Sequence, residues 1–257
     1  MSFALETRGL SRSFGALTVA DRIDFRLEPG ARHALIGPNG AGKTTFVNML
    51  TGVLAPSSGR ILLGGADVTR EGPAARVKRG LGRTFQINAL FGHLSALDNV
   101  ALGVAERLGV AQHAWRPASA HREIRDESLE LLAALGLADD AQRRLIDLPY
   151  GQQRLVEIAI ALGTQPTVLL LDEPAAGVPS LESQRILHVL DGLPAQMAIL
   201  IIEHDMELVF RFARRITVLA QGEVLMEGTP AEVAADRRVH DVYLGEAAVR
   251  RVRDDDP

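Results

Sequence analysis

The stretch Gly37-Pro38-Asn39-Gly40-Ala41-Gly42-Lys43-Thr44-Thr45 decides the fold of this chain. It fits the pattern G-x-x-x-x-G-K-[ST] and stands between two segments of opposite character. Residues 32–36 before it are typical of a short buried strand, and residues 46–50 after it favour a helix with no breaker before Gly52. A strand, a glycine-rich turn and a helix in this order predict a phosphate-binding loop.

The residue types in this loop explain how it would hold a triphosphate. Gly37, Gly40 and Gly42 let the backbone approach the phosphates closely, because no side chain stands in the way. The first turn of the following helix would aim its unpaired amides and its positive dipole end at the same anion. Lys43 would add a positive charge beside the β- and γ-phosphates, and the Thr44 hydroxyl is an oxygen ligand suited to Mg²⁺.

Composition limits the other possibilities. The chain has 257 residues, of which 47% are hydrophobic, so it is long enough for one large domain with a sizeable core. A net charge of -4 argues against a general nucleic-acid binder, and the lack of cysteine excludes disulfides and cysteine-based metal sites. Apolar runs such as residues 198–202 are far shorter than the ~18 residues that span a bilayer. We therefore expect a soluble, cytoplasmic chain that reaches a membrane only through a partner.

Two apolar runs, residues 167–171 and 198–202, predict buried strands that end in polar groups. Open α/β sheets bind ligands at the carboxyl ends of their strands. Asp172, after the first run, would suit an outer-shell contact to Mg²⁺, and Glu173 a general base or water-orienting group for attack on the γ-phosphate. His204, after the second run, is expected at the same sheet edge and in contact with the γ-phosphate.

The remaining segments predict a β region near the N-terminus and a helical insert. Strands are expected over residues 3–28 around a turn at 9–15, over 59–65, 81–86, 216–220 and 223–227, and helices over 73–79 and 230–244. Strand signals vanish over residues 95–147. There, periodicity predicts helices over 97–108 and 121–135, followed by a helix over 154–162. The pattern indicates an α/β core that carries an inserted helical subdomain.

Three further features are weak when taken alone. Phe14 is equally well explained as a core residue or as a ring that stacks on a nucleotide base. Gln86 follows a predicted strand, where an amide is commonly just solvated. The stretch Tyr150-Gly151-Gln152 is a glycine-containing turn that opens a helix, and is therefore a second potential anion site.

Taken in order, these stretches resemble the ATPase subunit of an ATP-binding cassette transporter. The order is the phosphate loop, Gln86, a helical insert that ends in a Gly-Gln-Gln signature, Asp172-Glu173 and His204, and the resemblance covers about residues 4–246. It implies an α/β P-loop NTPase fold of the ABC type, with an antiparallel β subdomain and an inserted α-helical subdomain. The single ATPase domain would span residues 1–246, with the helical subdomain at about 95–163 and a charged tail over 247–257.

The resemblance also implies a mechanism. Two such subunits would dimerise head to tail and enclose two ATP molecules, each bound by the whole phosphate loop of one chain. Tyr150, Gly151 and Gln152 would reach the γ-phosphate of the partner's nucleotide, and Phe14 would stack on adenine. Thr44, Gln86 and Asp172 would bind Mg²⁺. Glu173 would activate the attacking water together with Gln86, and His204 would contact the γ-phosphate.

Two departures from the wider superfamily point to a subfamily. Pro149 replaces the usual signature serine, and residues 175–180 lack the aspartate common after the two acids. Both variants, with residues 82–86 and 242–246, are similar to the branched-chain amino-acid uptake subfamily. That resemblance implies a second ATPase subunit, two transmembrane permease subunits, a periplasmic solute-binding protein, and a place on the cytoplasmic face of the bacterial inner membrane. Related systems carry urea, amides or aromatic acids, and the pocket that selects the solute would lie in other chains.

Three alternatives have different signatures. The ATPase of a lipopolysaccharide-type exporter shares the fold but fits the signature and the C-terminal region less well. A soluble cassette ATPase of DNA repair or translation typically has two cassettes or a long coiled-coil insert. A small-molecule kinase would need neither residues 150–153 nor His204.

Overall fold

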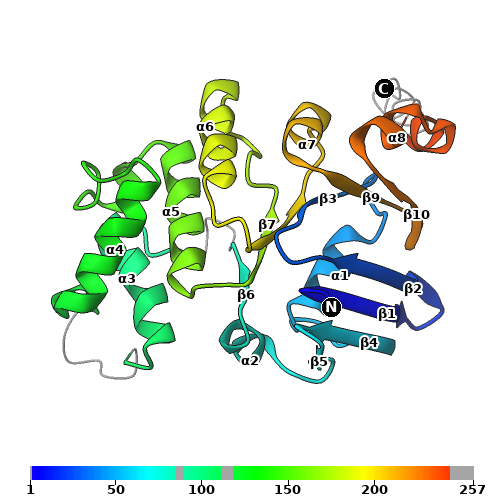
Figure 1. Ribbon diagram of the computed structural model, residues 1–257, viewed down its shortest axis with the longest axis horizontal. Coiled ribbons are helices and arrows are strands. Elements are labelled where there is room, and N and C mark those ends of the chain that lie inside the picture. The colour runs from blue at the N-terminus through cyan, green and yellow to red at the C-terminus, as the bar shows by residue number, and fades with distance from the viewer. Residues whose placement is uncertain (1, 85–89, 111–117, 244–257) are drawn as a thin grey trace, which may run out of the picture. The chain divides into compact units, whose positions relative to one another are not determined.

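The computed structural model describes residues 2–84, 90–110 and 118–243. Two compact units make up the chain (Figure 1). Residues 1–76 and 198–257 form the first, called here the sheet unit, and residues 77–197 form the second, called the helical unit. The chain thus leaves the sheet unit after residue 76 and returns to it at residue 198.

The sheet unit contains an antiparallel sheet with the strand order β2-β1-β4-β5. Its strands are β1 (Leu5–Phe14), β2 (Leu17–Leu27), β4 (Ser58–Leu63) and β5 (Ala66–Asp67). Leu5 pairs with Leu27 on one side and with Leu63 on the other. All three leucines are buried and form part of one wall of the core. Burial alternates along residues 23–27 of β2, as expected for a strand with one face in the core. The predicted β region near the N-terminus is confirmed.

The position of the first turn differs from the prediction. β1 continues through Gly9 to Phe14, and the turn comes at residues 15–16. Gly9 has φ +56 and lies at a shift of register between Thr7 and Leu10, and its amide donates to Asp24 Oδ1 at 2.7 Å. A β-bulge absorbs the left-handed glycine without ending the strand.

A second set of strands in the sheet unit surrounds β3. The set comprises β8 (Ala198–Ile202), β3 (Arg32–Ile36), β9 (Arg215–Ala220) and β10 (Glu223–Gly228). β3 is parallel to both β8 and β9, while β9 and β10 form an antiparallel hairpin. Every residue of β3 and β8 is buried. β8 is accordingly a continuous apolar run, whereas β3 begins with the buried polar residues Arg32 and His33. The predicted strands and hairpin are confirmed here.

Three helices of the sheet unit are α1 (Lys43–Leu50), α7 (Met206–Phe212) and α8 (Pro230–Ala235). α1 follows the phosphate loop as predicted. Thr229 and Glu232 form a capping box that starts α8. The predicted helix over 230–244 is interrupted at Asp236, and residues 237–243 are again helical.

Among its described residues, the helical unit contains a pair of parallel strands and the helices α3 to α6. These elements are β6 (Leu81–Arg83), β7 (Val168–Asp172), α3 (Ala96–Arg107), α4 (Arg122–Ala134), α5 (Tyr150–Gly163) and α6 (Ser180–Asp191). Helices α3, α4 and α5 lie side by side (Figure 1), and Gly103 lets α3 approach α5 so closely that a Cβ atom there would lie 2.5 Å from the Ile160 carbonyl oxygen. The helices predicted over 97–108 and 121–135 are confirmed, whereas α5 begins earlier than the expected residue 154.

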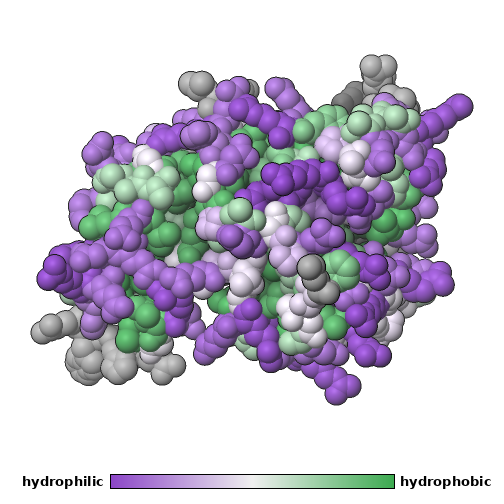
Figure 2. All heavy atoms as spheres, viewed as in Figure 1, coloured by the Kyte–Doolittle hydropathy of each residue, from purple (hydrophilic) through white to green (hydrophobic). Residues whose placement is uncertain are grey.

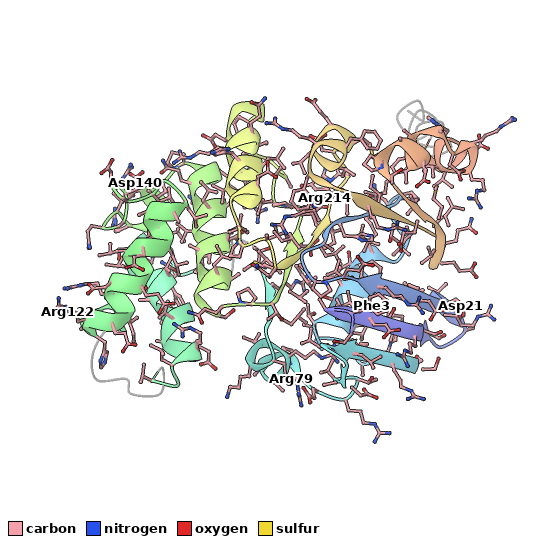
Figure 3. The ribbon with its side chains drawn as sticks, in the orientation of Figure 1. Phe3, Asp21, Arg79, Arg122, Asp140 and Arg214 are labelled. Atoms are coloured by element: carbon pink, nitrogen blue, oxygen red, sulfur yellow. The ribbon has the colours of Figure 1, made fainter. Side chains whose placement is uncertain are left out.

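The surface of the helical unit is mixed. Charged side chains such as that of Arg122, which is 89% exposed, point outward (Figure 3). Apolar patches interrupt the hydrophilic surface over α4 and α5 in the view of Figure 2. Helix α2 (Pro73–Lys78) stands where the two units join in the sequence.

Candidate functional site

The phosphate loop connects β3 to α1 and is pressed against neighbouring backbone. A Cβ atom at position 37 would lie 2.2 Å from the carbonyl oxygen of Leu219, and one at position 42 would lie 2.5 Å from that of Val19. Gly42 also has φ +96, a conformation that other residues avoid. Only glycine therefore fits these two positions, and β2 and β9 hold the loop in place.

The first turn of α1 is arranged for an anion. Its N-cap is Gly42, which supplies no side-chain cap to the helix amides. Lys43 Nζ donates to the carbonyl oxygens of Gly37 at 2.5 Å and Pro38 at 2.9 Å. Thr44 is exposed at the start of the helix. Backbone amides, a dipole end and an ammonium group thus converge, and this combination binds phosphate.

The other loop residues occupy the rim and the base. Asn39 and Gly40 are exposed, Thr45 is half-buried, and Ala41 is buried. The Ala41 carbonyl oxygen accepts a hydrogen bond of 3.1 Å from the Gly222 amide, in the turn between β9 and β10. This bond fastens the base of the loop to the sheet.

His204 leaves the sheet at the same edge as the phosphate loop. β3 and β8 are parallel, and Leu35 pairs with Ile202. Gly37 and His204 each follow two residues later, so both lie beyond the carboxyl ends of adjacent strands. The His204 side chain is 64% exposed there.

Glu203 is a neighbour of His204 that we did not single out from the sequence. Its carboxylate is buried and accepts a hydrogen bond of 3.1 Å from the His204 amide. The Glu203 amide in turn donates to the Leu35 carbonyl oxygen at 3.4 Å. An acid directly after a fully apolar strand was the available signal for this residue.

Phe14 lies at the end of β1, in the hairpin whose return strand borders the phosphate loop. Its side chain is 48% exposed, so the core interpretation of this residue is wrong. The guanidinium of Arg12 lies 4.5 Å from the ring centroid and covers one face. An exposed ring with a cationic neighbour is compatible with stacking on a base.

In the helical unit, β7 ends at the two acids. Arg83 at the end of β6 donates to Asp172 Oδ2 at 2.9 Å, and the Asp172 amide donates to Thr84 Oγ1 at 3.4 Å. Glu173 is exposed and has φ +47, a left-handed conformation that is strained for a side-chain-bearing residue. Such strain is concentrated at functional sites.

The signature residues form the first turn of α5. Pro149 is the N-cap, and Tyr150, Gly151 and Gln152 follow as the first helical residues. We expected the helix from residue 154; the glycine of the signature continues the helix instead of preceding it. Among the described residues, the buried Oε1 atom of Gln152 has no hydrogen-bond partner.

A buried ion pair supports the signature turn. Arg154 donates to Tyr150 Oη at 3.1 Å and to Glu157 Oε2 at 2.9 Å. Burial raises the pKa of Glu157 to about 7 in spite of this ion pair. The Tyr150 ring also lies near Gly177, where an added Cβ atom would be 3.5 Å from a ring carbon. Tyr150 is thereby fixed from two directions.

The candidate residues therefore fall into two groups. The sheet unit holds the phosphate loop, Phe14 and His204, and the helical unit holds Asp172 and Glu173 together with the signature turn. Gln86 lies outside the described residues. Within the described ranges, no cluster of three or more metal-ligating side chains occurs.

Comparison with known proteins identifies the class to which this site belongs. The family model "ABC transporter" matches residues 20–176, and the model "Branched-chain amino acid ATP-binding cassette transporter" matches residues 223–249. The chain belongs to the ATP-binding cassette transporter family, as one of its ATPase subunits.

Its branch of the family is that of branched-chain amino-acid transport. The chain is 39% identical to the high-affinity branched-chain amino acid transport ATP-binding protein LivG of Escherichia coli (strain K12) over 256 residues, 95% of this chain and 98% of LivG. The predicted family and subfamily are both confirmed.

Solved structures confirm the predicted fold class. The ADP conformation of MJ1267, an ATP-binding cassette of an ABC transporter, superposes with a TM-score of 0.85 at 29% identity, covering 95% of this chain and 99% of that one. The dimeric structure of MJ0796, a bacterial ABC transporter cassette, has a TM-score of 0.75 at 25% identity and covers 88% and 98%. Cassettes of this fold bind nucleotide and form dimers.

Proposed function

We propose that the chain powers the uptake of branched-chain amino acids or closely related solutes by hydrolysing ATP. The observation that carries this proposal is the full-length similarity to LivG, which extends through a C-terminal segment matched by the branched-chain amino-acid model. The Pro149-Tyr150 variant of the signature supports the same subfamily. Exporters and soluble cassette ATPases explain these subfamily features less well.

Each candidate residue has a proposed part in hydrolysis. The loop from Gly37 to Thr45 holds the triphosphate. Its backbone fits a closely bound phosphate chain, because Gly37 and Gly42 lie against neighbouring backbone where a Cβ atom would clash, and Gly40 adds no side chain. Thr44, Asp172 and Gln86 would hold Mg²⁺, which neutralises phosphate charge when bound. Their hydroxyl, carboxylate and amide oxygens are the donor types that this ion prefers.

The remaining roles concern the attacking water, the γ-phosphate and the adenine ring of the nucleotide. Glu173 orients and deprotonates the water, together with Gln86, and His204 contacts the γ-phosphate. Phe14 stacks on adenine with its exposed ring. These assignments follow the order of the motifs and the edge position shared by His204 and the phosphate loop.

We further propose that two ATPase subunits enclose the nucleotides between them. The signature residues Tyr150, Gly151 and Gln152 then serve the nucleotide of the partner subunit, and their place at a helix N-terminus suits a phosphate. The dimeric structure of MJ0796 supports the pairing of two such subunits. The working domain is residues 1–246, with the helical subdomain at about 95–163 and a charged tail over 247–257.

A small exposed apolar surface on the helical unit favours the proposal that the chain binds a membrane subunit. Phe91 is 58% exposed and Ile146 is 59% exposed, and Leu94 is exposed beside them. The Ile146 amide donates to the Gly92 carbonyl oxygen at 3.0 Å, so the two segments are joined. Exposed apolar clusters of this kind commonly mark protein–protein contacts.

This surface also bears on where the chain works. In the part of the chain that the structure describes, no helix is long and apolar enough to span a membrane. We propose that two permease subunits hold this subunit, with a second ATPase, on the cytoplasmic face of the inner membrane. A periplasmic binding protein delivers the solute to them.

Affinity purification from native membranes tests the proposal. The tagged chain, solubilised in mild detergent, is expected to bring down two permease subunits and a second ATPase. The same complex in vesicles with its binding protein should accumulate labelled leucine in the presence of ATP. Recovery only with ribosomes, DNA or no partner would refute the transporter, and uptake of urea or aromatic acids without leucine would correct the solute.

A further inference from the structure

A side-chain carboxylate of the chain itself contacts the signature turn, the first turn of α5. The amide of Gly151, in the first turn of α5, donates to Oε2 of Glu182 at 3.1 Å. Glu182 belongs to the first turn of α6, and it is half-buried. A Cβ atom at position 151 would lie 2.0 Å from the same carboxylate oxygen, so only glycine admits this contact. A carboxylate thus occupies a helix N-terminus that favours negative charge.

The contact with Glu182 uses one of the few hydrogen-bond donors that the signature turn can offer to a phosphate. Pro149 stands at the N-cap, where it offers neither an amide hydrogen nor a side-chain hydroxyl. The donors of the turn are therefore the backbone amides that follow, and Glu182 holds that of Gly151. A phosphate oxygen that used the Gly151 amide would meet the carboxylate at close range.

We propose that Glu182 is an internal competitor for the signature turn, which the terminal phosphate of the partner's nucleotide must displace. This inference rests on the proposed nucleotide-bridged pair of subunits. Two negative groups that share one donor repel each other strongly at a partly desolvated site. Glu182 therefore opposes closure of the pair and acts as a brake on ATP hydrolysis.

The carboxylate has somewhere to go when it is displaced. Glu182 lies in the first turn of α6, whose N-cap Pro179 supplies no side-chain hydrogen bond. The dipole of α6 therefore continues to favour the charge after the contact with Gly151 is broken. Because the residue is half-buried, a change of rotamer would bring it toward water.

The signature turn does not depend on Glu182 for its shape. Arg154 Nη2 donates to the Tyr150 hydroxyl at 3.1 Å, and the Arg154 guanidinium lies 5.3 Å from the centroid of the Tyr150 ring. The amide of Gln153 donates to the Pro149 carbonyl oxygen at 3.0 Å, which closes the first helical turn. Removing the carboxylate should thus free the Gly151 amide without unwinding the helix.

The test compares ATP-dependent pairing of the full chain with and without this carboxylate. Glu173→Gln serves as the background, because slow hydrolysis would preserve the ATP-bound pair. Glu182→Gln removes the charge at nearly constant shape, Glu182→Ala removes the group, and Glu123→Gln, in the exposed first turn of α4, is the matched control. Sedimentation velocity gives the ATP concentration at half-maximal pairing.

We expect both Glu182 variants to lower that concentration on the order of tenfold, with Glu123→Gln unchanged. Binding of ATP to the unpaired chain should stay constant, because the signature serves the partner. In the assembled transporter with Glu173 intact, the same variants should lower KM for ATP and raise hydrolysis without solute.

The outcomes separate this inference from the proposal beneath it. Pairing with an unchanged ATP dependence, or weaker pairing in both Glu182 variants, overturns the competitor role while the nucleotide-bridged pair stands. If neither the chain alone nor the assembled transporter shows ATP-dependent association of its ATPase subunits, the nucleotide-bridged pair is wrong and the role of Glu182 is wrong with it.

Discussion

Arg76 donates a hydrogen bond of 2.6 Å from Nη1 to the carbonyl oxygen of Leu50, the last residue of α1. The same nitrogen donates to the Met49 carbonyl oxygen, also at 2.6 Å. α1 begins at the phosphate loop, so a buried cation at its far end complements the helix dipole and donates to carbonyl groups of the last turn. The Met49 carbonyl oxygen also accepts a hydrogen bond from the Gly52 amide at 3.2 Å. Arg76 therefore supports the helix that follows the phosphate loop from the end of the helix that is remote from the loop.

Replacing Arg76 by methionine should destabilise the sheet unit by about 3 kcal/mol, because several buried carbonyl groups lose a charged donor. Arg76→Lys, which keeps the charge and some donors, should lose less. Chemical denaturation of the purified chain measures both. Arg70→Met, at an exposed position, is the control, and equal stability of the two methionine variants would contradict the capping role.

Lys43→Ala should weaken ATP binding on the order of tenfold to a hundredfold, because a charged donor to the phosphates is lost. Its Nζ atom contacts the loop carbonyl groups of Gly37 and Pro38, so the thermal midpoint should fall only slightly. Isothermal titration with ATP and a thermal melt separate the two effects. Lys78→Ala is the matched control, and unchanged affinity in Lys43→Ala would refute the phosphate-loop assignment.

Glu173→Gln should leave ATP binding intact and lower turnover on the order of 10²–10⁴-fold, because the group that orients and deprotonates water is lost. The amide also keeps the size of the side chain in its strained backbone conformation. Steady-state phosphate release from the assembled transporter is the measurement, with Glu130→Gln on the exposed face of α4 as the control. Wild-type turnover would exclude Glu173 from the chemistry.

Ile146→Ser should weaken assembly with the membrane subunits, because it removes the centre of the apolar surface shared with Phe91 and Leu94. Binding of ATP to the isolated chain should not change. Co-purification yield from native membranes gives the first quantity and titration the second. Val53→Ser, at a residue 63% exposed in the sheet unit, should co-purify normally; equal yields would remove this surface from the interface.

Much of the fold could be predicted because its signals are local. Continuous apolar runs identified β7 and β8, and the glycine pattern placed the turn before α1. The Gly9 bulge was missed because a left-handed glycine looks the same in a bulge and in a turn. The start of α5 differs from the prediction because a glycine-containing stretch favours a turn before the helix, whereas Gly151 lies inside the first helical turn.

The contacts that adjust the site could not be predicted. Asp172 pairs with Arg83, and Gly151 with Glu182, across long separations in the sequence. The sequence predicts a short basic helix over residues 73–79 but gives no sign that its Arg76 is only 1% exposed. Pairings of this kind depend on how elements pack, which periodicity and motif spacing do not encode.

His33, in the strand that leads into the phosphate loop, should make the chain sensitive to acid. Its ring is buried, its Nε2 atom lies 2.8 Å from Thr217 Oγ1, and burial lowers its pKa to about 4. The unfolded chain protonates this histidine below about pH 6.5, but the folded chain does so only near pH 4. The contribution of the neutral His33 to the free energy of unfolding is therefore fully present above pH 6.5. It is lost as the pH falls toward 4, which lowers the stability by up to about 3 kcal/mol.

Thermal melts between pH 4 and pH 7.5 measure this effect. His33→Gln can keep a hydrogen bond to Thr217 but cannot take up a proton, so its midpoint should fall less steeply with acid than that of the wild type. His121→Gln, at an exposed position before α4, should follow the wild-type curve. Parallel curves for the wild type and His33→Gln would mean that the carboxylates alone cause the acid sensitivity. A flatter dependence of the midpoint on pH in His33→Gln, but not in His121→Gln, would show that His33 causes part of the acid sensitivity. That histidine lies in the strand that leads into the phosphate loop.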